Sequence, residues 1–195
     1  MLSLFKFKQN RGFSLVEMLV VIVIFLIITG IIVANYPQFK DQSALELMAQ
    51  EMAVNIRTAQ VLGTGTRVGS SGPAAARSYG VHFNSDNTNK FISFIGSNKE
   101  DGTFDEGDKI VEEYTLQGAD ITNFYDQSGD DLTGVFDITY RRPNPEARIL
   151  HNNSNITGDS LTIKIKSKRG GDRCKQIRIS INGQIAVIPG FQCQQ

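Results

Sequence analysis

The chain has 195 residues, and its 20 basic and 20 acidic side chains give a formal net charge of zero. This length suits one domain with accessory segments, and the balanced charge gives no overall sign of a nucleic-acid-binding protein. The charges are unevenly placed, because residues 1–12 hold three cations and no acid and the remainder therefore carries a net charge of −3.

An apolar segment follows the basic N-terminus. Between residues 13 and 34 the only hydrophilic side chains are Ser14, Glu17 and Thr29. A helix of this length spans about 30 Å, the thickness of a bilayer hydrocarbon core. Cations before the segment and none within it predict a cytoplasmic N-terminus and an exported body, in the periplasm or outside the cell. A cleaved secretory signal would have a shorter apolar core, and residues 34–37 form a poor cleavage site for one.

The helix is predicted to continue to residue 62. Between residues 41 and 62 apolar side chains recur at spacings of three and four, which is typical of one buried helical face; they are Leu45, Met48, Met52, Ile56, Ala59 and Leu62. Pro37 lies between the two halves and is expected to bend or interrupt the helix. We therefore predict one helix over residues 13–62, with a transmembrane first half at 13–34 and a second half that packs against a domain.

Residues 63–195 are predicted to form that domain, an antiparallel β-sheet. Residues 63–77 are rich in glycine and small polar residues and predict a loop, without the spacing of a phosphate-binding loop or a nucleophile elbow. Short strand-like runs then follow at 78–83, 90–96, 109–116, 134–140, 160–166, 176–181 and 184–188. Their alternation indicates strands with one buried face, and Asn182-Gly183 indicates a hairpin. The predicted fold class is α+β, with the helix covering the sheet.

The segment from Arg11 to Glu17, RGFSLVE, followed by an apolar run, resembles the class III leader of type IV pilins and type II secretion pseudopilins. The resemblance is strong over residues 6–36 and looser over the rest, where a long helix on an antiparallel sheet is the pilin fold. It implies that a prepilin peptidase removes residues 1–12 as a cytoplasmic leader by cutting after Gly12. It also implies that the new amine of Phe13 is N-methylated.

Glu17 is the one acidic residue of the predicted span. A charged side chain near the centre of a membrane costs about 2.5–3.5 kcal/mol, and less near the interface, so such a residue is functional when a partner can be named. The resemblance names the Phe13 amine of a neighbouring subunit as that partner, in a pair that sets the register of assembly. The alternative is a plain signal anchor in which Glu17 reaches the headgroups.

The resemblance therefore implies a structural filament subunit and not an enzyme, and no catalytic motif contradicts it. Its partners would be prepilin peptidase, other pilin or pseudopilin subunits, the inner-membrane assembly platform and membrane lipid. The size of the body and a weaker similarity over residues 46–60 and 176–188 favour a minor subunit, such as an H-type pseudopilin. A signal-anchored binding domain that never polymerises is the alternative, and a membrane-anchored hydrolase is a weaker one.

Two charged patches and two cysteines complete the candidate sites. One patch offers oxygen ligands for Ca²⁺ from Asp101, Asp105, Glu106 and Asp108. The glycines of this segment do not stand where the EF-hand pattern requires them, so a solvated acidic loop without a metal is favoured. No other cofactor is expected. Cys174 and Cys193 fall on the exported side, where an even count predicts one disulfide, with two free thiols as the alternative.

The second patch is basic and covers residues 164–178. Its cations are Lys164, Lys166, Lys168, Arg169, Arg173, Lys175 and Arg178. Clustered cations are what a minor pilin of DNA uptake would use. No aromatic residue is interleaved for base stacking, and alternating lysines also keep an exposed strand soluble. DNA is therefore not expected as a partner, and DNA uptake is kept as an alternative function.

Overall fold

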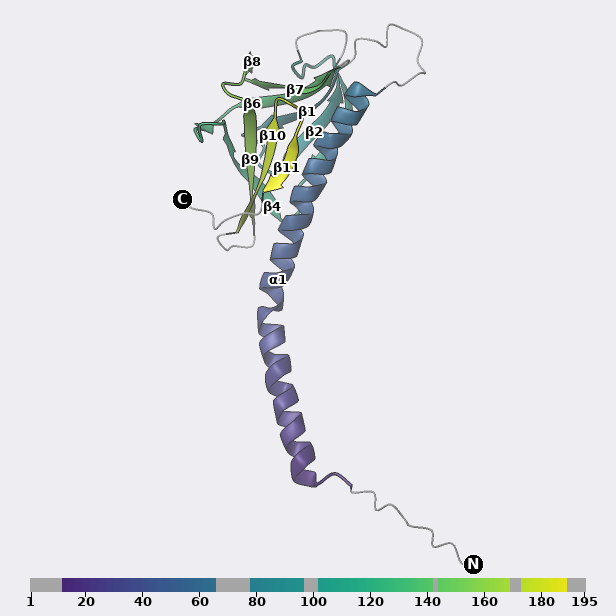
Figure 1. Cartoon of the computed structure of the whole chain (residues 1–195), viewed down its shortest axis with the longest axis vertical. Helices are drawn as coiled ribbons and strands as arrows, with labels where there is room; N and C mark the ends of the chain where they lie inside the picture. Colours follow the sequence, from purple (N-terminus) through teal and green to yellow (C-terminus); the bar gives the residue numbers. More distant parts are fainter. Residues whose placement is uncertain (1–11, 66–77, 97–101, 142–143, 169–172, 189–195) are drawn as a thin grey trace, which may run out of the picture. The chain divides into compact units, whose positions relative to one another are not determined.

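The structure is a computed structural model that describes residues 12–65, 78–96, 102–141, 144–168 and 173–188 (Figure 1). Its residues fall into two units, Met1–Lys40 and Asp41–Gln195. Helix α1 (Leu15–Thr64) contributes to both units, and the strands of the described ranges all belong to the second.

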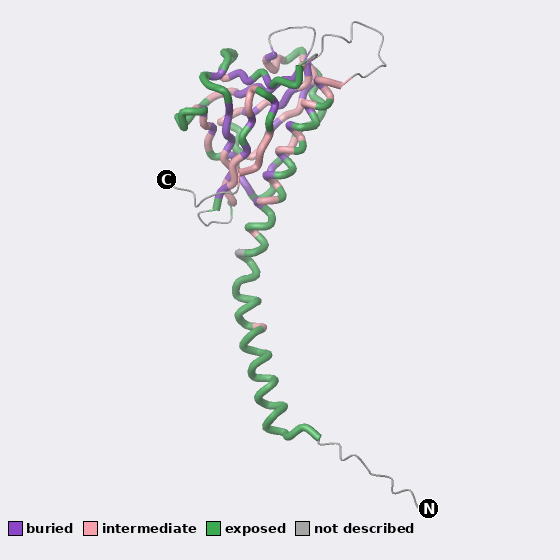
Figure 2. Tube along the Cα trace, in the orientation of Figure 1, coloured by how far each residue is buried: buried purple, intermediate pink, exposed green. Residues whose placement is uncertain are grey.

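The first unit contains the N-terminal part of α1. Its described side chains are exposed along nearly the whole length (Figure 2), although most of them are large and apolar. Within the described residues α1 is the one helix long and apolar enough to cross a membrane. The helix is continuous through Pro37, so the predicted interruption is absent. Proline removes only one backbone donor, and the turns on both sides keep their own hydrogen bonds.

The second unit begins with the other part of α1, which carries the apolar stripe predicted for residues 41–62. Four of its predicted members, Leu45, Met52, Ile56 and Ala59, are buried, and the other two, Met48 and Leu62, are half-buried. Ala49, which was not predicted, is also buried. Burying a large aliphatic side chain contributes about 1.5–3 kcal/mol as an upper estimate, so this stripe is the main attachment of the helix. At its end Gly63 lies so close to β6 that an added Cβ would come within 2.5 Å of the Tyr140 carbonyl oxygen.

Two antiparallel sheets make up the rest of the second unit. The first has six strands, in the order β3 (Lys109–Thr115), β2 (Lys90–Ile95), β1 (Tyr79–Asn84), β6 (Val135–Arg141), β7 (Asn144–His151) and β8 (Ser154–Asn155). The second has five strands, in the order β11 (Ile185–Ile188), β10 (Cys174–Ser180), β9 (Ser160–Ser167), β4 (Ala119–Tyr125) and β5 (Asp131–Leu132). The predicted α+β class, a long helix packed on an antiparallel sheet domain, is confirmed.

Every strand-like run of the sequence contains a strand, but β4, β5, β7 and β8 were not predicted. The alternation of β4 is broken by a register shift between Ile121 and Asn123. The first residues of β7 are Asn-Pro-Glu, which have low strand propensity, and β5 and β8 have two residues each. Pairing with neighbouring strands, and not local preference, therefore creates these four strands.

One core joins the helix to both sheets. Alternate residues of β9 and β10 are completely buried, as their alternation predicted; they are Leu161, Ile163, Ile165, Ile177 and Ile179. The opposite face of β9 is not fully exposed as expected, because Ser160 and Thr162 are buried as well. Polar contacts add to this core at the β10–β11 connection. The Gln60 side-chain amide donates to the carbonyls of Pro145 and Gly183, each at 3.0 Å, and the Ala147 amide donates to the Ile181 carbonyl at 2.7 Å. The connection spans residues 181–184, longer than the predicted two-residue hairpin, with Gly183 at φ +85°.

Candidate functional site: the start of the N-terminal helix

The predicted cleavage junction lies immediately before α1. Residues 12–14 have no regular secondary structure, and the helix begins at Leu15. No atom lies within 4 Å of the position that a Cβ on Gly12 would take, and the Phe13 side chain is 77% exposed. Among the described residues, the Gly12–Phe13 peptide bond therefore lies outside regular secondary structure and is exposed, as a peptidase requires.

Ser14 belongs to the same segment, and no role was predicted for it from the sequence. The Met18 amide donates to the Ser14 carbonyl at 3.2 Å, which makes Ser14 the N-cap residue of α1 and Glu17 the third residue of its first turn. Serine at the N-cap with glutamate three residues later is the capping-box pattern, in which each side chain can serve a backbone amide of the other residue. The signal S-x-x-E before an apolar run was present in the sequence.

The position of Glu17 suits a carboxylate. The first turn of a helix has unpaired amides and a partial positive charge, and both favour an acidic side chain. No lysine, arginine or histidine occurs between residues 13 and 39, so the span contains no cationic side chain that could pair with Glu17. A cationic partner for Glu17 must therefore come from outside residues 13–39.

Cys174 and Cys193 are the two cysteines of the predicted disulfide. Cys174 is the first residue of β10 and is buried, with 4% of its surface exposed. Cys193 lies outside the described residues. The disulfide between them therefore stays a prediction.

The acidic loop is described only in part, because Asp101 also lies outside the described residues. Asp105 and Asp108 close a turn: the Asp105 amide donates to Asp108 Oδ2, and the Asp108 amide to the Asp105 carbonyl, both at 3.0 Å. In the ranges that the structure describes, no three His, Cys, Asp or Glu side chains are gathered as metal ligands would be. A Ca²⁺ site that includes Asp101 remains a prediction.

The basic patch of residues 164–178 is divided between two faces of the second sheet. Four of its cations bind side chains of the same chain. Lys175 pairs with Glu46, and Lys168 pairs with Asp120 at 3.0 Å. Arg173 donates to Gln42 at 3.0 Å, and Arg178 donates to Thr162 Oγ1 at 3.4 Å. On the outer face, Lys164 lies over the ring of Tyr125, with its Nζ 5.9 Å from the ring centre. Arg169 lies outside the described residues. Strand pairing thus separates cations that are close together in sequence, and it places beside them an aromatic residue from β4.

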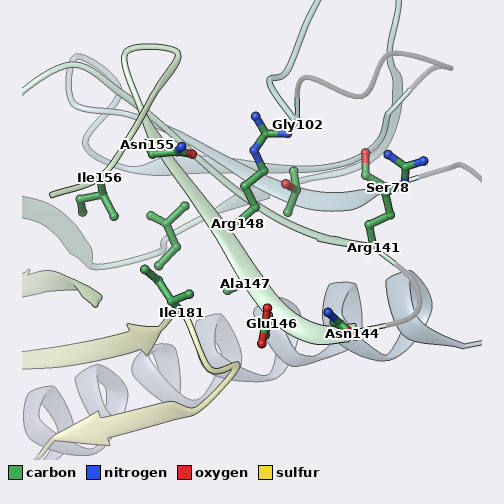
Figure 3. Close-up of a pocket in the computed structure, with 12 residues that line it drawn as sticks. Ser78, Gly102, Arg141, Asn144, Glu146, Ala147, Arg148, Asn155, Ile156 and Ile181 are labelled. Atoms are coloured by element: carbon green, nitrogen blue, oxygen red, sulfur yellow. The ribbon is translucent and has the colours of Figure 1, made fainter. Parts of the chain in front are cut away.

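Two hollows of the sheet domain are alternative candidate sites. One, of about 460 Å³, follows β7 and has an apolar wall of Ala147, Ile149, Ile156 and Ile181. Figure 3 shows Arg148 and Glu146 extending from β7 in different directions around it. The other, of about 550 Å³, is lined mainly by polar side chains, Arg178 among them. The described residues that line the two hollows include no histidine and no cysteine, and therefore no nucleophile–base pair of the Ser–His or Cys–His type.

Comparison with known proteins identifies the N-terminal segment. Residues 7–33 match the family model described as the prokaryotic N-terminal methylation motif. No curated protein and no solved structure matches the chain. The matched residues include the Gly12–Phe13 junction, Ser14, Glu17 and most of the span, and the motif points to a structural protein anchored in a membrane by its N-terminal helix. The chain thus carries the prokaryotic N-terminal methylation motif and, with its long apolar helix before an antiparallel sheet domain, is consistent with a type IV pilin or pseudopilin.

Proposed function

We propose that this chain is a minor structural subunit of a type II secretion pseudopilus or a type IV pilus. The observation that carries the proposal is the Gly12–Phe13 junction, which stands open immediately before α1 inside a segment that matches the methylation motif. Prepilin peptidase would cut after Gly12 on the cytoplasmic side. Because this cut precedes the apolar run, the span stays in the mature protein as the element through which subunits assemble.

Assembly would use the charges at the new N-terminus. Cleavage frees the amine of Phe13, which is then N-methylated and keeps its positive charge. Glu17 lies in the first turn of α1 and has no cation of its own span to neutralise it. Pairing Glu17 with the Phe13 amine of an adjacent subunit removes two unpaired charges from the membrane, where charged groups are costly. It also fixes how far adjacent helices are displaced along their axes.

The orientation follows from the cations of the leader. Cations placed before the span favour a cytoplasmic N-terminus, so the sheet domain would be exported and would surround the helices of an assembled filament. The assembly platform of the inner membrane and the neighbouring subunits would then be the partners of α1. The basic patch gives DNA uptake little support, since three of its cations already bind Glu46, Asp120 and Gln42.

Processing tests this proposal against a signal-anchored domain that does not polymerise. We expect co-expression with a prepilin peptidase to shorten the full-length chain by its 12-residue leader. N-terminal sequencing of the shortened chain should then begin at methylated Phe13. Gly12→Leu should block the cut, while Gly12→Ala, the smallest change, serves as the matched comparison. A chain that keeps residues 1–12 in the presence of active peptidase would contradict the proposal.

A further inference from the structure

A groove lies between α1 and the β2–β3 end of the first sheet, entirely within the second unit. Its residues come from the helix on one side and from β2, β3 and the segment after β3 on the other; they are Ala44, Leu47, Met48, Glu51, Phe91, Tyr114, Thr115, Leu116 and Gln117. Its volume is about 280 Å³, smaller than the ~300–1,000 Å³ of typical small-molecule sites. We call it the α1–β3 groove. Its size suits one anchoring side chain better than a cofactor.

The floor of the groove is apolar. Phe91 and Leu116 are buried, and the Phe91 and Tyr114 rings stack with their centres 4.8 Å apart. Leu47 at the rim is 69% exposed although it lies beside this apolar floor. An exposed leucine next to buried aromatic rings offers an apolar contact surface, and contacts of this kind anchor protein interfaces when a partner side chain fills them.

The rim of the groove is acidic. The Tyr114 hydroxyl donates to Glu112 Oε2 at 2.7 Å. Burial, followed by the neighbouring carboxylates of Glu112 and Glu51, raises the pKa of Tyr114 above its usual value. Lys90, the closest cation along β2, already pairs with Glu113 at 2.6 Å. The groove therefore fits an apolar side chain that is accompanied by a positive charge.

The chain itself carries such a pair of residues. Phe39 is 69% exposed and is followed directly by Lys40, which is also exposed. Within the described ranges, no other exposed aromatic residue has a cation next to it in the sequence. The span of residues 13–34 already has the ~30 Å needed to cross the hydrocarbon core, so Phe39 lies beyond that core. In a filament that has left the membrane, lipid would not cover this side chain.

We propose that the α1–β3 groove of one copy binds Phe39 of a second copy, with Lys40 of that copy facing Glu51. The inference rests on the proposed function, because assembly places subunits side by side, and it requires in addition that two copies of this chain be neighbours in the filament. The two contacting surfaces differ, so the contact is heterologous and can repeat along an open filament. It adds a second intersubunit contact, outside the membrane, to the pairing of Glu17 with the Phe13 amine.

Photo-crosslinking of the full-length chain tests the contact. Benzoylphenylalanine replaces Phe39, and cells that express the chain with prepilin peptidase are irradiated. Trypsin cleaves after Lys40, Arg57, Lys90, Lys99, Lys109 and Arg141, so peptides 41–57, 91–99 and 110–141 together contain all residues of the groove. We expect a crosslinked dimer in which position 39 of one copy is joined to one of these three peptides. Crosslinks to lipid alone, to a different protein alone or to other peptides of this chain would overturn the proposal, as would no crosslinked product.

Charge reversal supplies the second measurement. Glu51→Lys should lower the yield of the groove crosslink about fivefold, which corresponds to roughly 1 kcal/mol. Adding Lys40→Glu to the same chain should restore the yield, because the pair is then reversed. Asp86→Lys, in the turn after β1, is the matched control and should leave the yield unchanged. Thermal unfolding of each variant separates a lost contact from a damaged fold, and failure of the double variant to recover would count against Lys40 as the partner of Glu51.

The same cells distinguish this inference from the function on which it rests. Mechanical shearing separates fibres from membranes, and the crosslink is measured in both fractions. A wild-type chain that enters fibres without the groove crosslink overturns the contact and leaves the proposed function standing. A chain that carries the crosslink in membranes but never enters fibres contradicts the proposed function and keeps the contact between copies.

Discussion

Ser14 and Glu17 occupy the two capping positions at the first turn of α1. Ser14 is the N-cap and Glu17 the third helical residue, so the carboxylate lies close to the unpaired amides of the turn. A capping box can stabilise the carboxylate before a partner subunit is present, because it supplies hydrogen-bond donors where water is scarce. The position of Glu17 therefore allows a capping role within its own helix as well as the proposed role between subunits.

The two roles of Glu17 can be separated by substitution. Glu17→Gln keeps a side-chain oxygen that can accept the capping hydrogen bond but removes the charge, whereas Glu17→Ala removes both. If charge pairing drives assembly, both variants should still be processed normally. The amount of each variant found in sheared fibres should fall about tenfold or more, which corresponds to a pair worth over ~1.4 kcal/mol. Immunoblots of sheared fibres against membranes measure this. Normal incorporation of Glu17→Gln would contradict charge pairing and leave capping as the role of this residue.

Gly63 is a residue whose identity is required by packing between the end of α1 and β6. A Cβ at this position would come within 2.5 Å of the Tyr140 carbonyl oxygen and 2.8 Å of the Tyr140 Cβ. We expect Gly63→Ala to destabilise the protein by about 1–3 kcal/mol, because the helix end must move away from β6. Urea unfolding of the two proteins measures the difference. Ser43→Ala, at an exposed position of the same helix, is the control and should change stability by less than about 0.5 kcal/mol.

At the scale of elements, the helix is held to the second sheet by an ion pair as well as by its apolar stripe. Lys175 of β10 pairs with Glu46 of α1. Hydrogen bonds from Lys175 and then from Gln50 lower the pKa of Glu46 below 4.5. Because the pKa is lowered in the folded state, the stabilisation is fully present above about pH 4.5 and is lost as the pH falls through the lower folded-state pKa.

This pair gives a pH-dependent prediction. Glu46→Gln should reduce the free energy of unfolding at pH 7 by less than about 1 kcal/mol, since Glu46 is largely exposed and surface pairs are screened by solvent. The difference between variant and wild type should shrink as the pH falls below 4.5 and as salt rises. Unfolding curves at pH 7 and pH 3.5 measure it, with Lys175→Met and the double variant completing a cycle. If the difference in the free energy of unfolding between variant and wild type is unchanged at pH 3.5, the effect comes from packing and not from the charge of Glu46.

Strand formation shows where local sequence information was sufficient. The alternating isoleucines of β9 and β10 specify which face is buried, because successive strand residues point to opposite sides. β7 lacked such a signal: its Asn-Pro-Glu start reads as a turn, yet it pairs with β6 from Phe136 to Arg141. Its identity as a strand comes from the long-range ladder, which a local pattern cannot reveal.

At the scale of the whole molecule, the two units differ in whether their described apolar side chains are buried. Among the described residues the buried core begins at Leu45, and no apolar side chain of residues 12–40 belongs to it. The apolar residues of 13–34 therefore need another environment, either lipid or the helices of other subunits. The second unit has its own core, which includes residues from α1 and both sheets.

This division predicts that the second unit folds without the first. A fragment of residues 41–195 should be soluble and should unfold cooperatively, because it retains the complete buried core. A fragment of residues 65–195 should not fold, because it loses the helical stripe that covers the sheets. Circular dichroism with thermal unfolding distinguishes the two fragments. Loss of structure in the longer fragment would show that the first unit contributes to folding of the second.

The sequence by itself determined the local features: the cleavage motif, the apolar span and the strands with clean alternation. Each of these depends on the order of neighbouring residues, through the period of a helix or a strand or through the spacing of Gly12, Phe13 and Glu17. Only the tertiary structure decided how the basic patch is divided, which strands β4 and β7 join, and how α1 and β3 form a groove with an acidic rim. The physical reason is that these features depend on which distant residues are paired, and strand register and helix packing set that pairing together with the whole core.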